Sequence, residues 1–194
     1  SHDDAAAQLA DSTAFDFDTT VVWADDVDSA AELATYDVLV LGGSGYSSDR
    51  ALYTEAMYTA LATYLADGGG VVTTGWYNYN TDGLGEPSAS FADAITPIAD
   101  DGYNWAPGGS LVQIVDPVHP VTLGVTDYNV GSNHIEYETA IDPGAVRLAG
   151  IDGVANGNAI VVHQLAQGRS VYLGGQYMAR TTYNTNPLRT GAED

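Results

Sequence analysis

The sequence contains no cysteine and no lysine, and each absence excludes a class of chemistry. Without cysteine there is no thiol nucleophile and no thiolate ligand for a metal ion. Without lysine there is no side-chain amine that forms a Schiff base with a carbonyl substrate. The sequence also has no run of about 18 apolar residues, so it predicts no insertion into a membrane.

Positive charge is scarce as well. The five basic residues are all arginine and face 26 acidic residues, which gives a formal net charge of −21. Such a surface repels the phosphates of nucleic acids and anionic lipids, so we expect neither as a partner. It suits a saline or calcium-rich medium. We therefore expect an extracellular or cell-surface location, with Ca²⁺ as the cofactor to consider.

The length predicts one domain. A chain of 194 residues that is 45% hydrophobic is large enough to bury a full core, so we expect a single domain over 1–194. Residues 181–194 have no clear apolar face and are expected to be a loosely ordered tail. The chain opens without methionine and without an apolar leader, which predicts a piece of a larger protein.

The chain is organised around residues 36–46. An apolar run at 38–41 lies between Asp37 and a glycine cluster, which is typical of a strand buried on both faces of a parallel sheet. A helix over 51–66 and a strand over 71–75 follow. Ligands of such sheets bind beyond the carboxyl ends of the strands, so residues 42–48 and 75–81 are the places to look for function.

The rest of the chain fits an α/β fold. We predict a helix over 3–10, a strand over 15–23 and a helical turn over 29–35, an order that implies a first strand outside the sequence. Further on we predict aromatic loops over 76–87 and 100–109, a helix over 90–98, a strand over 111–115, and hairpin strands over 146–151, 159–164 and 169–174. The predicted fold is a three-layer, flavodoxin-like sheet, mostly parallel with late antiparallel hairpins.

Four segments carry a resemblance to a known family: 36–43, 65–72, 119–124 and 168–174. In this order and spacing, over 15–178, the chain resembles the class I glutamine amidotransferase-like superfamily, in its ThuA-like (trehalose-utilisation-like) branch. The resemblance implies the flavodoxin-like fold.

Two departures argue against the amidotransferase reaction. Catalytic members of the superfamily carry a cysteine at a sharp elbow, and the matching elbow at 74–77 has Trp76 in that place. An indole cannot attack a carbonyl carbon. ThuA-like members also tend to have Gly-His after the last strand, whereas Gly175 is followed here by Gln176. The resemblance therefore implies a protein that has lost this activity.

Aromatic residues at the strand ends are the main candidates for a binding site. Rings cover the apolar faces of a sugar or peptide, while Asn and Asp bind its hydroxyls or amides. The alternative is that these rings bury one another. The candidate ligand-binding residues are Ser44, Tyr46, Trp76, Tyr77, Asn78, Tyr79, Tyr103, Trp105, His119 and Glu136.

Weaker candidates carry the alternative hypotheses. Ser44 follows a strand end, but no Gly-x-Ser-x-Gly elbow or nearby base supports it as a nucleophile. Prolines hold His119 rigidly, either for catalysis and ligand contact or for packing. His134 and Glu136 share a strand face and would form a metal site with His163. Asp25, Asp26 and Asp28 offer oxygen ligands for calcium, or cap helices on a solvated face.

These observations favour a non-catalytic module that binds a carbohydrate, a peptide or other domains of a larger secreted or cell-surface protein. Two alternatives stay open. One is a hydrolase that uses Ser44 or a histidine-based metal site, and the other is a spacer domain stabilised by calcium.

Overall fold

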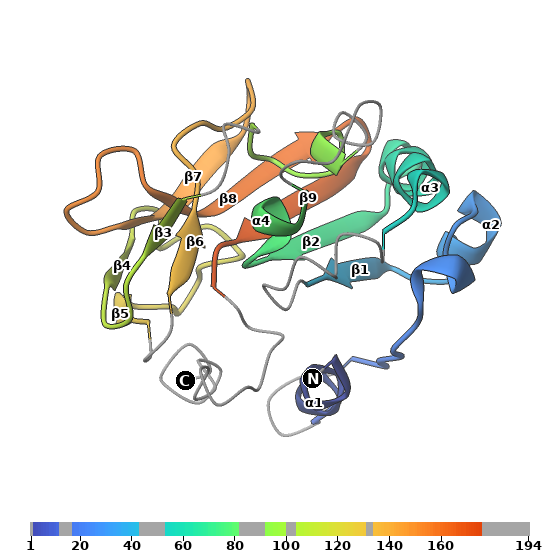
Figure 1. Ribbon diagram of the computed structural model, residues 1–194, viewed down its shortest axis with the longest axis horizontal. Helices are drawn as coiled ribbons and strands as arrows, with labels where there is room; N and C mark the ends of the chain where they lie inside the picture. The colour runs from blue at the N-terminus through green and yellow to red at the C-terminus, as the bar shows by residue number, and fades with distance from the viewer. Residues whose placement is uncertain are drawn as a thin grey trace.

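The computed structural model describes residues 2–11, 17–42, 53–81, 92–99, 104–130 and 134–175. Its main feature is a seven-stranded sheet in the order β1-β2-β9-β8-β7-β4-β5 (Figure 1). A separate ribbon pairs β3 (Asn104–Ala106) with β6 (Ile135–Tyr137). The strands of the large sheet are β1 (Val38–Leu41), β2 (Gly70–Thr74), β4 (Leu111–Ile114), β5 (Tyr128–Asn129), β7 (Val146–Ile151), β8 (Asn158–Leu165) and β9 (Gly168–Leu173).

The large sheet joins a parallel part to an antiparallel part. Strands β1, β2 and β9 run parallel to one another. Strands β8, β7, β4 and β5 continue the sheet antiparallel. The last strand of the described residues, β9, lies in the middle of the sheet, so the late hairpins extend the parallel part directly. The predicted α/β, flavodoxin-like fold with late antiparallel hairpins is thereby confirmed.

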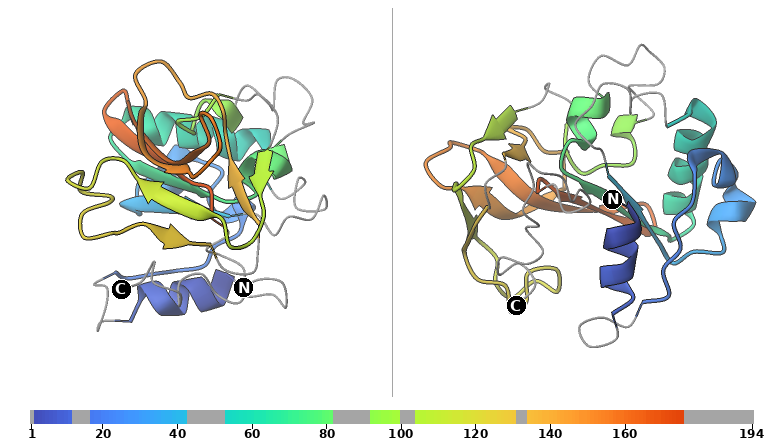
Figure 2. Two further views of the ribbon diagram at one scale, coloured as in Figure 1. Left: turned by 90° about the vertical axis from the view of Figure 1, so that its left-hand side faces the viewer. Right: turned by 60° about the horizontal axis from the view of Figure 1, so that its bottom comes forward.

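Helices lie on both sides of the parallel strands. The views of Figures 1 and 2 show α1 (His2–Leu9) and α3 (Glu55–Ala66) on opposite sides of β1 and β2. Helix α3 begins after Thr54, whose side-chain oxygen accepts the N–H of Met57 at 3.1 Å. No helix in the described ranges is both long and apolar enough to cross a membrane.

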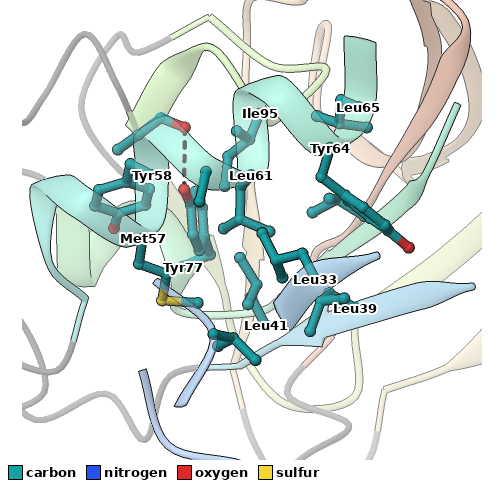
Figure 3. Packing of buried hydrophobic residues seen from close by; sticks show 14 residues of the cluster. Leu33, Leu39, Leu41, Met57, Tyr58, Leu61, Tyr64, Leu65, Tyr77 and Ile95 are labelled. Carbon is teal, nitrogen blue, oxygen red and sulfur yellow. Dashed lines mark hydrogen bonds between the residues drawn. The ribbon is translucent and has the colours of Figure 1, made fainter. Parts of the chain in front are cut away.

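The main core lies between α3 and the parallel strands. Leu61 of α3 is fully buried and packs in one cluster with Leu39 and Leu41 of β1 (Figure 3). The short helix α2 (Ala30–Leu33) adds Leu33 to this cluster. Because neighbouring residues of a strand face opposite ways, β8 contributes to two further clusters, Val161 to one and Ile160 to the other.

Three predicted elements differ from the structure. Residues 17–23, the described part of the predicted strand over 15–23, form no strand. The predicted loop over 100–109 contains strand β3. In the predicted helix over 90–98, only residues 92 and 93 of the described part are helical, and Ile98 instead forms an isolated bridge with Ile141. In each case the secondary structure depends on pairing with distant parts of the chain, which local sequence patterns do not show.

Candidate functional site

The candidate site is the elbow that follows β2. At its start, the N–H of Gly75 donates to the carbonyl of Gly175 at 2.9 Å, which ties the ends of β2 and β9 together. Trp76 then adopts a positive φ of 69°, an uncommon conformation for a residue with a side chain. Helix α4 (Tyr77–Thr81) follows at once. The expected loop over 76–87 is therefore a helical turn in its described part, and the strand–elbow–helix geometry is present.

A buried carboxylate lies against this elbow. The backbone N–H of Glu136 in β6 donates to the carbonyl of Gly174 at 3.0 Å, which places β6 at the carboxyl end of β9. Its Oε1 accepts the backbone N–H of Tyr79 at 2.8 Å, and its Oε2 accepts the hydroxyl of Tyr172 at 3.3 Å. The side chain is fully buried. Glu136 thus joins β6, β9 and α4.

Burial dominates the electrostatics of Glu136. Desolvation raises the pKa of this carboxyl to about 7, because the charged form loses its hydration inside the protein. Hydrogen bonds from the backbone N–H groups of Tyr79, Trp76 and Asn78 and from the Tyr172 hydroxyl act in the opposite direction. The backbone N–H groups of Trp76, Asn78 and Tyr79 therefore bind a carboxylate of the chain itself. In a catalytic elbow such donors stabilise the oxyanion of the substrate.

Two pairs of aromatic rings flank Glu136. The rings of Trp76 and Tyr79 meet edge to face, with centroids 5.7 Å apart. Trp105 of β3 lies opposite Glu136 in the ribbon, and its ring meets that of His134 edge to face at 4.4 Å. The side chain of Trp105 is 51% exposed. Tyr79 and Trp105 are thus both direct neighbours of Glu136, one by hydrogen bond and one by strand pairing.

Other predicted site residues are buried. Tyr77 is part of the main core, and its hydroxyl donates to the carbonyl of Ala92 at 3.0 Å, the dashed line in Figure 3. Burial raises the pKa of Tyr77 well above its usual value. Asn78 is also buried, and its Nδ2 has no hydrogen-bond partner within the described ranges. Tyr77 therefore follows the alternative interpretation, in which aromatic residues of this segment pack inside the protein.

His119 lies away from the elbow. It belongs to the turn after β4, where its Nδ1 accepts the N–H of Val121 at 3.2 Å. The pairings of β7, β8 and β9 make β4 antiparallel to β2. The carboxyl end of β4 therefore lies at the end of the strands opposite to the one that carries Trp76. The structure therefore does not bring His119 to Trp76. Ser44, Tyr46 and Tyr103 lie outside the described residues.

The proposed metal ligands do not form a cluster. In the part of the chain that the structure describes, no group of three or more His, Asp or Glu side chains is arranged to hold a metal ion. His163 instead lies 3.9 Å from Asp142, through its Nδ1. Asp26 caps a short 3₁₀ turn, η1 (Ala24–Asp26), by accepting the N–H of Trp23 at 3.1 Å. Within the described residues, His134, Glu136 and His163 therefore do not form a group that could hold a metal ion. Asp25, Asp26 and Asp28 likewise form no such group.

Sequence reasoning missed two residues of this site. Tyr172 binds Glu136, and Gly174 lets β6 approach, since a Cβ atom there would lie 2.0 Å from the carbonyl oxygen of Glu136. Both lie in or next to the glycine-flanked strand at 168–174. A second buried acid, Glu138, was also not singled out, although it lies two residues from Glu136 on the same face of the chain.

Comparisons with known proteins support the fold. No protein-family model and no curated protein matches the chain. Among solved structures, the cytoplasmic protein STM1381 from Salmonella typhimurium LT2 aligns with a TM-score of 0.61 and 21% identity, over 90% of this chain and 75% of that one. A putative thua-like protein from Bacteroides uniformis ATCC 8492 aligns with a TM-score of 0.60 and 15% identity, over 93% and 77% of the two chains.

A larger enzyme contains a similar unit. The beta-galactosidase from Bacillus circulans sp. alkalophilus aligns with a TM-score of 0.51 and 14% identity, over 74% of this chain and 20% of that one. At these identities the similarity concerns the fold. The chain therefore has the fold of thua-like proteins, and the same fold occurs within a longer enzyme.

Proposed function

We propose that this chain is a non-catalytic module of the amidotransferase-like superfamily that binds a carbohydrate through the aromatic residues around its elbow. One observation carries the proposal. The backbone N–H groups of the elbow already bind the buried carboxylate of Glu136, and the residue in the nucleophile position is Trp76. An elbow that has an indole in place of a nucleophile, and whose N–H groups at Trp76, Asn78 and Tyr79 bind the chain's own carboxylate, is poorly suited to acyl transfer.

The aromatic side chains support a binding role. Trp105 keeps half of its surface exposed and pairs with the buried Glu136. Tyr79, whose ring meets that of Trp76, donates its backbone N–H to the same residue. The exposed ring of Trp105 and the partly exposed rings of Trp76 and Tyr79 are suited to the apolar face of a sugar ring. A peptide with an aromatic or proline side chain is the second ligand to test. An extracellular location and a requirement for calcium stay predictions.

The test is titration of the protein with a panel of neutral oligosaccharides, beginning with galactosides, followed by calorimetry on any that bind. Trp105→Ala should raise the Kd at least about tenfold, which corresponds to about 1.4 kcal/mol of lost contact. Trp23→Ala is the matched control, because Trp23 is 71% exposed but lies before η1, in a different part of the chain. Its Kd should equal that of the unaltered protein.

Three outcomes would overturn the proposal. The first is that no oligosaccharide or peptide of the panel binds. The second is that the two tryptophan variants weaken binding equally, which places the ligand elsewhere. The third is that a bound oligosaccharide is hydrolysed and that Glu136→Gln abolishes the hydrolysis, which would make the site an active one. A carboxyl with a pKa near 7 is suited to general acid catalysis, so this outcome needs its own assay.

A further inference from the structure

The two edges of the large sheet differ in how they are protected. The β5 edge has only two residues, Tyr128 and Asn129, and the carboxylate of the preceding Asp127 accepts the N–H of Ile114 at 2.8 Å. Short strands and charged neighbours are typical ways of keeping a sheet edge from pairing with other chains. The β1 edge is longer, at four residues, and is also preceded by an exposed acid, Asp37. Its sequence is Val-Leu-Val-Leu, without a charge, proline or bulge.

The backbone of β1 presents a regular set of free groups at this edge. The N–H of Gly70 donates to the carbonyl of Asp37 at 3.2 Å, which fixes the register with β2. Alternate residues of a parallel strand bond to the same neighbour, so Leu39 and Leu41 bond to β2. Val38 and Val40 therefore direct their N–H and C=O groups outward. Within the described ranges, no hydrogen bond reaches these groups.

Apolar side chains near this edge are also exposed. Val38 is 49% exposed. Val21 and Trp23 are exposed in the segment 17–23, whose pattern predicts a strand but which has no strand partner within the described ranges. Figure 2 shows this segment, in blue, between α1 and the short helix α2. Strand β1 pairs with β2 on one side only and has no partner strand on its outer side within the described ranges, so this edge can accept an additional strand.

The charges around the edge indicate what kind of strand fits. No lysine or arginine occurs before Arg50, whereas Asp18, Asp37 and the aspartates of 25–28 are exposed. A second copy of the chain would bring its own acidic residues against these, because the net charge of each copy is −21. A strand with basic residues at its ends would instead be attracted. This argument favours a different polypeptide over self-association.

We propose that the open edge of β1 binds an extended apolar strand of a partner polypeptide that is flanked by basic residues. The added strand hydrogen-bonds to the outward backbone groups of Val38 and Val40. This interaction surface is independent of the aromatic site at the elbow. Binding to it extends the sheet on the side where the described residues supply no further strand.

The first test uses the unaltered protein and a synthetic peptide in which valine and threonine alternate between lysine residues at both ends. Amide hydrogen exchange, followed by NMR, reports each backbone N–H separately. The peptide should slow exchange at Val38 and Val40 by at least about tenfold, since each gains a hydrogen bond. Exchange at Asn129, which the pairing of β4 and β5 directs outward at the other edge, should not change.

Two variants make the test specific. Val40→Pro removes one outward N–H and leaves the bonds to β2, because proline is tolerated at sheet edges. It should raise the Kd of the peptide about tenfold. Asn129→Pro is the matched control at the other edge and should leave the Kd unchanged. A peptide with glutamate in place of lysine should bind more weakly, and the difference should shrink as salt is added.

The opposite results would overturn the proposal. The first is that exchange at Val38 and Val40 stays unchanged at saturating peptide, and the second is that the two proline variants have equal effects on the Kd. The third is that Val38 and Val40 are protected from exchange without peptide, and that this protection increases with protein concentration. The last result would mean that a second copy of the chain occupies the edge. Sugar binding measured on the same samples separates a failure of this proposal from a failure of the elbow site.

Discussion

The carboxylate of Glu136 accepts the backbone N–H of Tyr79 at 2.8 Å, across 57 positions of sequence. This contact joins the β3–β6 ribbon to the elbow between β2 and α4. It also places a fully buried acid next to Trp76, the residue with positive φ at the elbow. Glu136 therefore has a structural consequence, the support of the elbow, and an electrostatic one, a raised pKa.

The electrostatic consequence can be measured as a pH dependence of stability. Burial raises the pKa of Glu136 from 4.5 to about 7, so between these values the folded protein holds a proton that the unfolded chain releases. The contribution of Glu136 to stability is therefore fully present below pH 4.5 and falls as the pH rises to 7, by a total of about 3 kcal/mol. Glu136→Gln should remove this dependence. The measurement is urea unfolding of both proteins from pH 4 to pH 8.

The many other acids of the chain make a control necessary for this experiment. Glu55→Gln changes an exposed glutamate at the start of α3, so its difference from the unaltered protein should not vary between pH 5 and pH 8. If Glu136→Gln gives the same flat difference, Glu136 is ionised at an ordinary pKa. That result would contradict the burial of the Glu136 side chain against the elbow.

The parallel part of the fold could be predicted because its signals are local. The apolar run at 38–41 and the helical spacing up to Ala66 specify strand and helix by periodicity and flanking glycines alone. The hairpins after 145 are set by tight turns. Helix α4 could not be predicted in this way, since its sequence Tyr-Asn-Tyr-Asn-Thr favours a loop. Its position depends on buried Tyr77 and on the distant Glu136.

The candidate site could be predicted only in part. The elbow at Trp76 follows from the end of β2 and from the resemblance, whereas the pairing of Trp105 with Glu136 was not predicted, because Trp105 was expected in a loop. The role of Glu136 did not follow, because a glutamate on a strand gives no sign that its partners are backbone N–H groups of another element. The same reason explains why the structure does not bring His119 to the elbow or His163 into a metal-binding group within the described residues: residue type indicates what a side chain can bind, whereas strand order decides what it meets.

The backbone conformation of Trp76 gives a second prediction. A positive φ of 69° costs a residue with a Cβ atom about 1 kcal/mol, and glycine does not incur this cost. Trp76→Gly should therefore be more stable than Trp76→Ala by about 1 kcal/mol, the reverse of the usual order for these residues. Both variants lose the ring contact with Tyr79, so that loss cancels in the comparison. Thermal unfolding of the two variants measures it, and a more stable alanine variant would mean that the elbow is not strained.

Tyr77 gives a third prediction, which separates packing from binding. Its hydroxyl donates to the carbonyl of Ala92 inside the core, so Tyr77→Phe should cost about 1–3 kcal/mol by leaving a buried acceptor unsatisfied. The same change should leave the Kd for a bound sugar unaltered, because the hydroxyl has no access to solvent. Chemical denaturation and calorimetry on one preparation measure both quantities. A weakened Kd at unchanged stability would return Tyr77 to the ligand site.

The net charge of −21 gives the last prediction. Like charges on the surface repel one another, and added salt screens this repulsion, so sodium chloride should raise the Tm steadily as the Debye length falls. Calcium and magnesium at equal ionic strength should then raise the Tm to the same extent. Calcium sites prefer several oxygen ligands in a flexible arrangement, and Asp26 already accepts the N–H of Trp23. A larger effect of calcium than of magnesium, lost in Asp25→Asn and Asp28→Asn, would instead support a calcium-stabilised spacer domain. Differential scanning calorimetry with the two chlorides decides between screening and a specific site.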